Sequence, residues 1–391
     1  MRIGVDACCW ANGRGYGRFT RELLGSMVRL APDDEFLFFV DDRAARRLDL
    51  QADNVTVVRV DQSESPTRAA AANGSRRVSD MLRLTRAVGR ERPNVFFSPS
   101  VYSYFPLPSR QRAVVAIHDV IAERYPHLTL PTLRARLFWR MKVALALRQA
   151  EIILTVSDFS ARGIHEFLRV PTSRIRVAGE APACVYRPSE EEDIRAAASR
   201  IGLPEGARWF VYVGGFNPHK RVTALVRAHA RVVHDEREQA PYLLLVGDAA
   251  GDAFHRDVEG IRETIAEVGT TDRVVWTGFV ADEELRHLHS GALALVLPSE
   301  TEGFGLPAVE AAACGTPVIA TTQSPLPGLL KGGGIFVSPG DQETLDGALR
   351  LLSKDARLRR EMGRRGLVAA RALTWDAGAE AALGAIREAA R

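Results

Sequence analysis

Cysteine is scarce in this sequence, and its four cysteines have no spacing typical of a metal site or a disulfide framework. Cys8, Cys9, Cys184 and Cys314 form no CxxC pair and no Cys/His motif. We therefore expect reduced and mostly buried thiols, and no metal bound by them.

Long apolar runs are also missing. No run approaches the roughly 18 residues of a membrane-spanning helix, and the start, "MRIGVDACCWANGRG", lacks the apolar core of a signal peptide. We expect a cytoplasmic protein. The composition, with 46% hydrophobic and 26% charged residues, is ordinary for a globular protein. The length of 391 residues exceeds the size at which a single hydrophobic core stops growing, so we expect two domains.

Positive charge is concentrated in the first half of the chain. Residues 1–187 hold 29 Lys and Arg against 19 Asp and Glu, or +10, which leaves 23 against 29, or −6, for the remainder. A basic half suggests an anionic partner, such as nucleic acid, a membrane surface or a phosphorylated molecule. Nucleic acid is disfavoured, because the arginines are spread over several helical segments instead of forming one basic face with aromatic platforms.

Short apolar runs alternate with helical patterns, which indicates parallel sheets covered by helices. The runs span 2–7, 35–40, 55–60, 94–99, 113–119 and 151–157 in the first half, and 209–215, 242–247, 273–279, 292–298, 316–321 and 334–339 in the second. We predict an α/β protein with two doubly wound, Rossmann-like domains of similar size.

The domain boundary is predicted in the polar segment "CVYRPSEEED" (184–193), where the sign of the charge changes. We assign residues 1–187 to the first domain and 188–373 to the second. Residues 374–391 are predicted to form a helix that packs back toward the first domain. Doubly wound domains bind ligands beyond the carboxyl ends of their strands, so two facing domains would share one cleft.

The stretch "SETEGFGLPAVEAAACGTPVIA" (299–320) follows one of these strands. Pro307 would break a helix unless it stood in the first turn, so we predict a loop that carries Glu302 and then a helix that carries Glu310. Backbone N–H groups at a helix start bind anions, whereas these carboxylates suit neutral hydroxyl donors. The alternative is a pair of solvated charges near a helix start.

Two glycine-rich loops also follow strands. In "NGRGYGRFTRELL", Gly15 and Gly17 precede residues at helical spacing, and a plain turn explains the loop as well as a phosphate cradle does. In "VYVGGFNPHKRV", Lys220 stands just beyond Gly215 and can reach a phosphate, although a solvated lysine fits this pattern too.

Another predicted strand ends in "AVVAIHD", which places His118 at a carboxyl end. This histidine is either a ligand-binding residue or a hydrogen-bonded structural one. No second carboxylate is placed in the sequence to tune it, so we do not expect an obligatory base.

The segment "PTLRARLFWRMKVALALRQA" (131–150) is predicted to be a helix rich in basic and bulky apolar residues. At 100° per residue, one side gathers Arg134, Leu137, Phe138, Met141, Leu145 and Arg148, and this stripe is flanked by Arg136, Arg140 and Lys142. Two interpretations stay open. The apolar residues pack on a sheet, or the helix lies in a membrane interface.

Five motifs together resemble those of the retaining family-4 glycosyltransferases of GT-B fold. They are "GRGYGRF", "AIHD", "VGGFNPHKR", "WTGFVADEEL" and "ETEGFGLPAVEAAACGTPVIA", in this order over nearly the whole chain, and the last is the most specific. The resemblance implies two Rossmann-like domains facing a central cleft. It also implies transfer of a hexose from GDP-mannose or a UDP-hexose to an acceptor hydroxyl, with retention of configuration.

The resemblance assigns roles in the second half of the chain. Glu302 would contact the donor sugar, Glu310 would hold the ribose hydroxyls, and Lys220 would neutralise the diphosphate. The other donor-binding positions there would be Gly215, Phe304, Gly305 and Leu306 near the sugar or diphosphate, and Phe279 and Val280, whose backbone would meet the base.

In the first half, His118 would lie beside the sugar's hydroxymethyl group, and Gly15 and Gly17 would close over the diphosphate. The implied catalytic residues are therefore His118, Glu302 and Lys220.

One position departs from the family pattern. Many relatives carry an arginine six residues before the lysine, where this chain has Gly214. The second diphosphate cation is therefore open, with Arg221 and Arg18 as candidates.

The expected partners are a nucleotide-sugar donor and a sugar, lipid-linked or other hydroxyl acceptor, with peripheral contact at the inner membrane surface through the basic half. No Asp-X-Asp tripeptide occurs, so we expect no metal and no cofactor besides the donor. Three alternatives remain. They are a GT-B-like sugar-nucleotide epimerase or hydrolase, an oxidoreductase supported by the first glycine loop, and a basic nucleic-acid-binding protein with a pI near 9.0.

Overall fold

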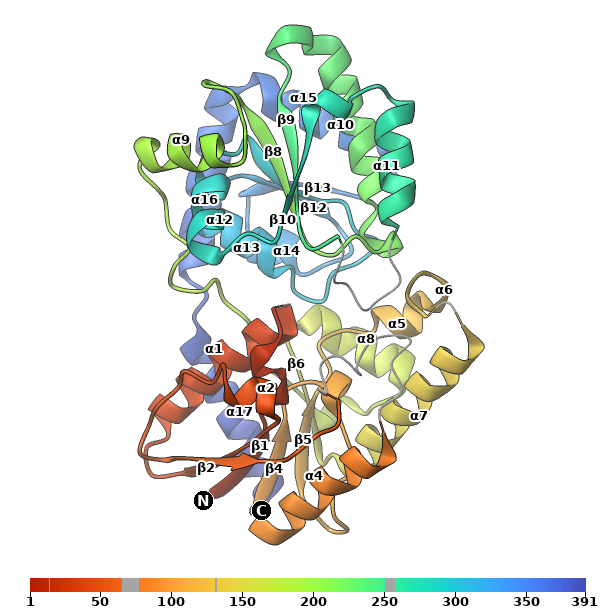
Figure 1. Cartoon of the computed structure of the whole chain (residues 1–391), viewed down its shortest axis with the longest axis vertical. Helices are drawn as coiled ribbons and strands as arrows, with labels where there is room; N and C mark the ends of the chain where they lie inside the picture. The colour runs from red at the N-terminus through yellow and green to blue at the C-terminus, as the bar shows by residue number, and fades with distance from the viewer. Residues whose placement is uncertain (14, 65–76, 131, 250–256) are drawn as a thin grey trace. The chain divides into compact units, whose positions relative to one another are not determined.

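The structure is a computed structural model of the chain (Figure 1), and it describes residues 1–13, 15–64, 77–130, 132–249 and 257–391. Pro131, where the predicted basic and apolar helix was taken to begin, lies outside these ranges. The described chain divides into two compact units. Unit 1 is Met1–Glu180 with Thr374–Arg391, and unit 2 is Ala181–Leu373.

The chain enters unit 2 after Glu180, whereas the sequence placed this boundary after Arg187. The buried side chain of Tyr186 explains the difference, because its hydroxyl donates a hydrogen bond to Asp282 of unit 2 at 2.8 Å. The polar linker pattern therefore starts after the chain has already joined unit 2.

The described part of unit 1 contains a seven-stranded parallel sheet in the order β3-β2-β1-β4-β5-β6-β7. The strands are β1 (Arg2–Asp6), β2 (Glu35–Val40), β3 (Val55–Arg59), β4 (Val95–Ser98), β5 (Ala113–Ala116), β6 (Ile152–Thr155) and β7 (Ile175–Val177). The sequence predicted the first six and missed β7, because three residues are too few for a periodic signal. The strand order reverses between β1 and β4, where doubly wound domains bind ligands.

Helices and 3-10 turns connect these strands. They are η1 (Cys8–Ala11), α1 (Gly15–Leu30), α2 (Asp42–Ala45), α4 (Val78–Glu91), η2 (Val101–Ser103), α5 (Ile121–Arg124), α6 (Pro126–Thr129), α7 (Leu133–Gln149), α8 (Asp158–Leu168), η3 (Thr172–Arg174) and α17 (Trp375–Ala390). The C-terminal helix α17 lies beside α1 in unit 1 (Figure 1), where the rings of Phe19 and Trp375 meet edge to face at 6.2 Å. The last helix of the chain thus completes the first unit.

The described part of unit 2 contains a six-stranded parallel sheet in the order β10-β9-β8-β11-β12-β13. The strands are β8 (Trp209–Val213), β9 (Tyr242–Val246), β10 (Val274–Gly278), β11 (Ala294–Leu297), β12 (Val318–Thr321) and β13 (Gly334–Val337). All six fall in predicted runs. Here the order reverses between β8 and β11, so these strands flank the expected ligand site of the unit.

The connections of unit 2 are again helical. They are α9 (Glu191–Arg200), η4 (Pro218–Lys220), α10 (Val222–Glu236), η5 (Arg237–Gln239), α11 (Val258–Glu267), η6 (Thr271–Arg273), α12 (Asp282–Gly291), α13 (Leu306–Ala313), α14 (Leu326–Leu329), α15 (Gln342–Lys354) and α16 (Ala356–Arg371).

The central strands are apolar on both faces because helices cover both sides of a parallel sheet. In unit 1, the ring of Phe96 contacts those of Phe39 and Phe105, each at a centroid distance of 5.7 Å. None of the four cysteines forms a disulfide, and Cys184 is exposed while the other three are buried. The GT-B expectation of two doubly wound domains is confirmed for the two units taken separately.

Candidate active site

Two loops of unit 2 leave neighbouring strands at the point where the strand order reverses. β8 leads through Gly215 to η4, which ends at Lys220, and β11 leads into the loop that carries Glu302. The Nζ atom of Lys220 lies 2.8 and 3.0 Å from the two carboxylate oxygens of Glu302. Tertiary structure therefore pairs two predicted site residues that are 82 positions apart in the chain.

The carboxylate of Glu302 is held from a second side by Ser299. The Ser299 hydroxyl is fully buried and donates a hydrogen bond of 2.6 Å to Glu302 Oε1. The backbone N–H of Glu302 also donates to the carbonyl of Gln323 at 3.0 Å. Ser299 was not among the residues predicted from the sequence, although a hydroxyl three residues before a loop glutamate is a signal that could have indicated it.

A second ion pair lies next to the first. Arg221 contacts a carboxylate oxygen of Glu300, and the backbone N–H of Glu300 donates to the carbonyl of His219 at 2.8 Å. The backbone of Arg221 is left-handed, with φ of 54°, an uncommon conformation for a residue with a side chain. Two consecutive cations of one loop thus face two carboxylates of the other.

Tyr212 accounts for the glycine at position 214. A Cβ at Gly214 would lie 3.0 Å from the Tyr212 hydroxyl, which itself donates to the carbonyl of Gly215. Burial and the charge of Glu302 raise the pKa of Tyr212 well above its usual value, so this side chain stays neutral. An arginine at position 214 would have to displace it.

The predicted joint between loop and helix is confirmed at α13. The helix begins at Leu306 with Pro307 in its first turn, and Gly305 precedes it with φ of 92°, which glycine adopts readily. Glu310 on this helix is 4% exposed and Glu302 is 8% exposed. The alternative of two solvated charges is therefore wrong.

The remaining predicted positions of unit 2 lie at the same edge of its sheet. Phe304 and Leu306 are buried beside Gly305. Phe279 and Val280 follow β10, two strands away from β8 in the sheet, and the Phe279 side chain is 75% exposed.

In unit 1, the glycine loop leads directly into α1, whose first turn contains Gly15 and Gly17. A Cβ at Gly17 would lie 2.1 Å from the carbonyl oxygen of Asn12, so a larger residue would force the loop away from the helix. The Asn12 side chain donates to the Tyr16 hydroxyl at 2.7 Å. The close approach of loop and helix explains why position 17 is glycine.

His118 follows β5 and is largely buried. Its Nε2 lies 2.8 Å from the carbonyl oxygen of Pro99, and since a carbonyl only accepts, this nitrogen carries the proton. Burial lowers the pKa of His118 to about 4, so the ring is neutral at pH 7 with Nδ1 as an acceptor. Nδ1 lies 4.0 Å from Glu180. The sequence predicted no carboxylate near His118. Glu180 lies close to it because Glu180 follows β7, and β7 pairs with β6 in the sheet.

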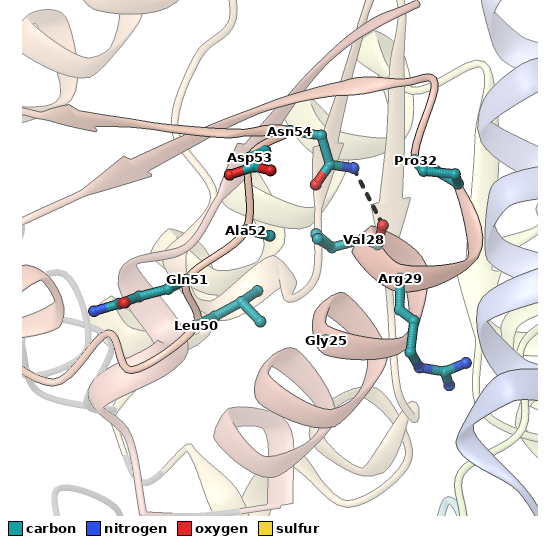
Figure 2. Close-up of a pocket in the computed structure, with 9 residues that line it drawn as sticks. All are labelled: Gly25, Val28, Arg29, Pro32, Leu50, Gln51, Ala52, Asp53 and Asn54. Atoms are coloured by element: carbon teal, nitrogen blue, oxygen red, sulfur yellow. Dashed lines mark hydrogen bonds between the residues drawn. The ribbon is translucent and has the colours of Figure 1, made fainter.

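A surface concavity of unit 1 lies away from these residues (Figure 2). It is lined by Gly25, Val28, Arg29, Pro32, Leu50, Gln51, Ala52, Asp53 and Asn54. Asn54 spans one side of it and donates to the Val28 carbonyl at 3.1 Å. Its loops precede β2 and β3, so it faces the amino ends of the strands, where doubly wound domains do not place their ligand sites.

Comparison with known families identifies the class. Residues 14–179 match the family described as Glycosyltransferase Family 4, and residues 193–367 match Glycosyl transferases group 1. The chain belongs to the family-4 glycosyltransferases of GT-B fold, and it transfers a sugar.

Individual relatives share about a third or less of their aligned residues with this chain. The chain is 28% identical over 284 residues to O-antigen chain mannosyltransferase B of Escherichia coli, covering 72% of this chain and 71% of that protein. It is 36% identical over 202 residues to the D-inositol 3-phosphate glycosyltransferase of Streptomyces avermitilis, covering 50% of this chain. That match spans less than half, 42%, of the Streptomyces protein.

Solved structures share the fold at low identity. Sucrose-phosphate synthase from Thermosynechococcus elongatus has a TM-score of 0.74 at 20% identity, covering 99% of this chain and 98% of that one. HepE of Anabaena, in complex with UDP and glucose, has a TM-score of 0.72 at 17% identity, with 99% of both chains covered.

Proposed function

We propose that this glycosyltransferase is a retaining, metal-independent enzyme that moves a hexose from GDP-mannose or a UDP-hexose to an acceptor hydroxyl in glycan or glycoconjugate biosynthesis. The observation that carries the proposal is the Lys220–Glu302 pair between β8 and β11. The name of the Escherichia coli relative supports a mannosyl donor, and the Anabaena complex with UDP supports a uridine nucleotide.

The chemistry follows from the leaving group. A nucleoside diphosphate leaves with negative charge, so transfer needs a cation and helix-start N–H groups more than it needs a strong base. Lys220 would release Glu302 and bind the diphosphate, which is the stronger charge-assisted partner. Glu302 would then accept hydrogen bonds from hydroxyls of the donor sugar, and Glu310 from the ribose.

Arg221 is our preferred second diphosphate cation. It follows Lys220 directly, and its side chain is already turned toward the Glu300–Glu302 loop by its pairing with Glu300. Arg18, the other candidate, lies on α1 of unit 1. Gly214 cannot supply this charge, so an arginine elsewhere has to do so.

In unit 1, His118 would contact the sugar as a neutral ring, and the Gly15–Gly17 turn would close over the diphosphate. Its low pKa makes His118 an acceptor for a sugar hydroxyl at neutral pH and not a proton donor. The acceptor proton would pass to a donor phosphate oxygen as the acceptor attacks from the leaving-group side. The new glycosidic bond then forms as the bond to the diphosphate breaks.

We propose that the acceptor is anionic or lipid-linked and that the protein is cytoplasmic, at the inner face of a membrane. The charge of residues 1–187 supports this proposal.

Thermal stabilisation by UDP, GDP and their sugars tests the donor, since a ligand of the native state raises the apparent melting temperature. Transfer by the matching donor should persist in EDTA and be nearly lost in Glu302→Ala, while Gly347→Ala, at an open position on α15, serves as the control. Activity abolished by EDTA and restored by Mg²⁺ or Mn²⁺ would refute the metal-free proposal. Sugar release that is equally fast without any acceptor would identify a hydrolase or epimerase instead.

A further inference from the structure

Helix α7 packs Trp139, Leu145 and Leu147 partly against the core of unit 1, and it also exposes four apolar side chains to solvent. Leu133, Leu137, Met141 and Phe138 are 81%, 61%, 61% and 38% exposed. The residues of this helix that are buried are small or medium-sized, namely Ala135, Val143 and Ala146. A covering helix normally keeps its outer face polar, so these four exposed apolar residues indicate a surface with a partner. The interpretation in which the apolar stripe packs on the sheet is wrong for its exposed members.

The exposed residues form a continuous line. Leu133, Leu137 and Met141 are spaced four apart, so they lie one above another along the helix. Figure 1 shows α7, in yellow, along the margin of unit 1, with no helix or strand drawn over its outer side.

The charge of α7 has one sign. The helix carries five Lys and Arg and no Asp or Glu. Arg134, Arg140 and Arg148 are exposed, and none of them forms an ion pair with any residue that the structure describes. Arg134 and Arg140 each stand three positions from Leu137, beside the apolar line.

The other two basic residues of α7 are engaged by the protein itself. Arg136 donates to the carbonyl of Leu130 at 2.9 Å, and Lys142 donates to that of Tyr102 at 3.0 Å. Arg136 and Lys142, which the sequence grouped with Arg140, are therefore less available to a partner than Arg134 and Arg148.

We infer that the outer face of α7, made of the exposed residues Leu133, Arg134, Leu137, Phe138, Arg140, Met141 and Arg148, docks on an anionic lipid bilayer. The apolar side chains enter the boundary between headgroups and acyl chains, and the guanidinium groups bind lipid phosphates. A second copy of this chain fits less well, because a symmetric contact would bring the same uncompensated arginines together. Among the described helices none is long and apolar enough to cross a membrane.

Vesicle sedimentation tests the inference without donor or acceptor, so its failure leaves the proposed transfer reaction standing. The full chain should sediment with vesicles of phosphatidylcholine and phosphatidylglycerol at low salt. It should stay in solution with phosphatidylcholine alone, and also at about 1 M salt, where the Debye length falls to about 3 Å.

Two triple variants separate the contributions. Arg134, Arg140 and Arg148→Gln should weaken vesicle binding on the order of a hundredfold, from roughly fivefold for each charge. Leu133, Leu137 and Met141→Ser should weaken it by at least about tenfold even at low salt. The matched controls are Arg46, Arg86 and Arg90→Gln, and Val78 and Leu82→Ser, which change exposed residues of the same unit that do not belong to α7.

The control variants should bind vesicles as strongly as the unchanged protein does. All variants should have the melting temperature of the unchanged protein, because every altered side chain is exposed. Equal sedimentation of the α7 variants and the unchanged protein would overturn the inference, as would a supernatant that holds all of the protein at low salt. A dimer that forms without vesicles and is lost in the Leu133, Leu137 and Met141→Ser variant would assign this face to a second copy instead.

Discussion

Lys220 and Glu302 form an ion pair that fastens two loops of unit 2 to each other, with Nζ 2.8 Å from the nearer carboxylate oxygen and side chains only 20% and 10% exposed. Water reaches neither group freely, so each group is the nearest counter-charge of the other. The same lysine is the proposed ligand of the diphosphate. The pair therefore holds this cation in place before the donor arrives.

Removal of the lysine should destabilise the fold through the carboxylate that remains. We expect Lys220→Met to lower the free energy of unfolding by about 2–3 kcal/mol, because it leaves a nearly buried charge without its cation. The double variant Lys220→Met with Glu302→Gln should recover most of that loss. Denaturant titration of both single variants and the double variant measures the coupling, and strictly additive losses would contradict it.

Replacing each of the two glycines of α17 by alanine should change the free energy of unfolding in opposite directions. A Cβ at Gly378 would lie 2.3 Å from the carbonyl oxygen of Gly179, so Gly378→Ala should cost about 1–3 kcal/mol of unfolding free energy. Gly384 has open space around it, and Gly384→Ala should add about 0.5–1 kcal/mol through better helix propensity. Melting temperatures of the two variants provide the comparison. A Gly378→Ala variant that melts no lower than the unchanged protein would show that the close approach of α17 to Gly179 is not a constraint.

His289 should make the protein less stable in acid. Neither ring nitrogen has a hydrogen-bond partner among the described residues, and burial, opposed by the charge of Asp282, lowers the pKa of His289 to about 3. Below the unfolded pKa of about 6.5, the unfolded chain binds more protons than the folded one, so stability falls as the pH falls.

The variant His289→Met cannot take up this proton. At pH 7 it should be more stable than the unchanged protein by about 1–2 kcal/mol, because an unpartnered buried polar group is removed. Its advantage should grow between pH 6.5 and 4. Denaturation midpoints at pH 7 and pH 5 give the measurement, and a constant advantage would show that the ring is not protonated on unfolding.

Glu123 should have the opposite pH dependence. Burial, with a smaller contribution from the charge of Asp119, raises the pKa of Glu123 to about 7, although Trp139 Nε1 donates to its carboxyl group at 2.7 Å. Between the unfolded pKa of about 4.3 and pH 7, the folded chain binds more protons, so this contribution to stability is lost as the pH rises.

Glu123→Gln keeps an acceptor for Trp139 but has no charge to bury. It should match the unchanged protein near pH 4 and exceed it in melting temperature above pH 7. A scan of both proteins from pH 4 to pH 8 checks the trend. If the difference in melting temperature shrinks as the pH rises, the carboxyl group of Glu123 does not have a raised pKa in the folded protein.

Local sequence determined most of the secondary structure and the loops of the site. Buried parallel strands need continuous apolar runs, so short stretches of sequence predicted the strands. Proline is tolerated in a helix only in its first turn, so Pro307 predicted where α13 begins. β7 could not be predicted, because its three residues are too few to show the alternation or apolar run that indicates a strand.

Tertiary structure decided which distant residues meet. Lys220 reaches Glu302, and Glu180 reaches His118, only because the strands pair in a particular order that no short window encodes. It also decided which side of α7 faces the solvent. Apolar and basic residues are distributed around that helix, so its periodicity does not define a buried side. Contacts with the rest of unit 1 decide that Val143 and Ala146 are buried while Leu137 and Met141 are exposed.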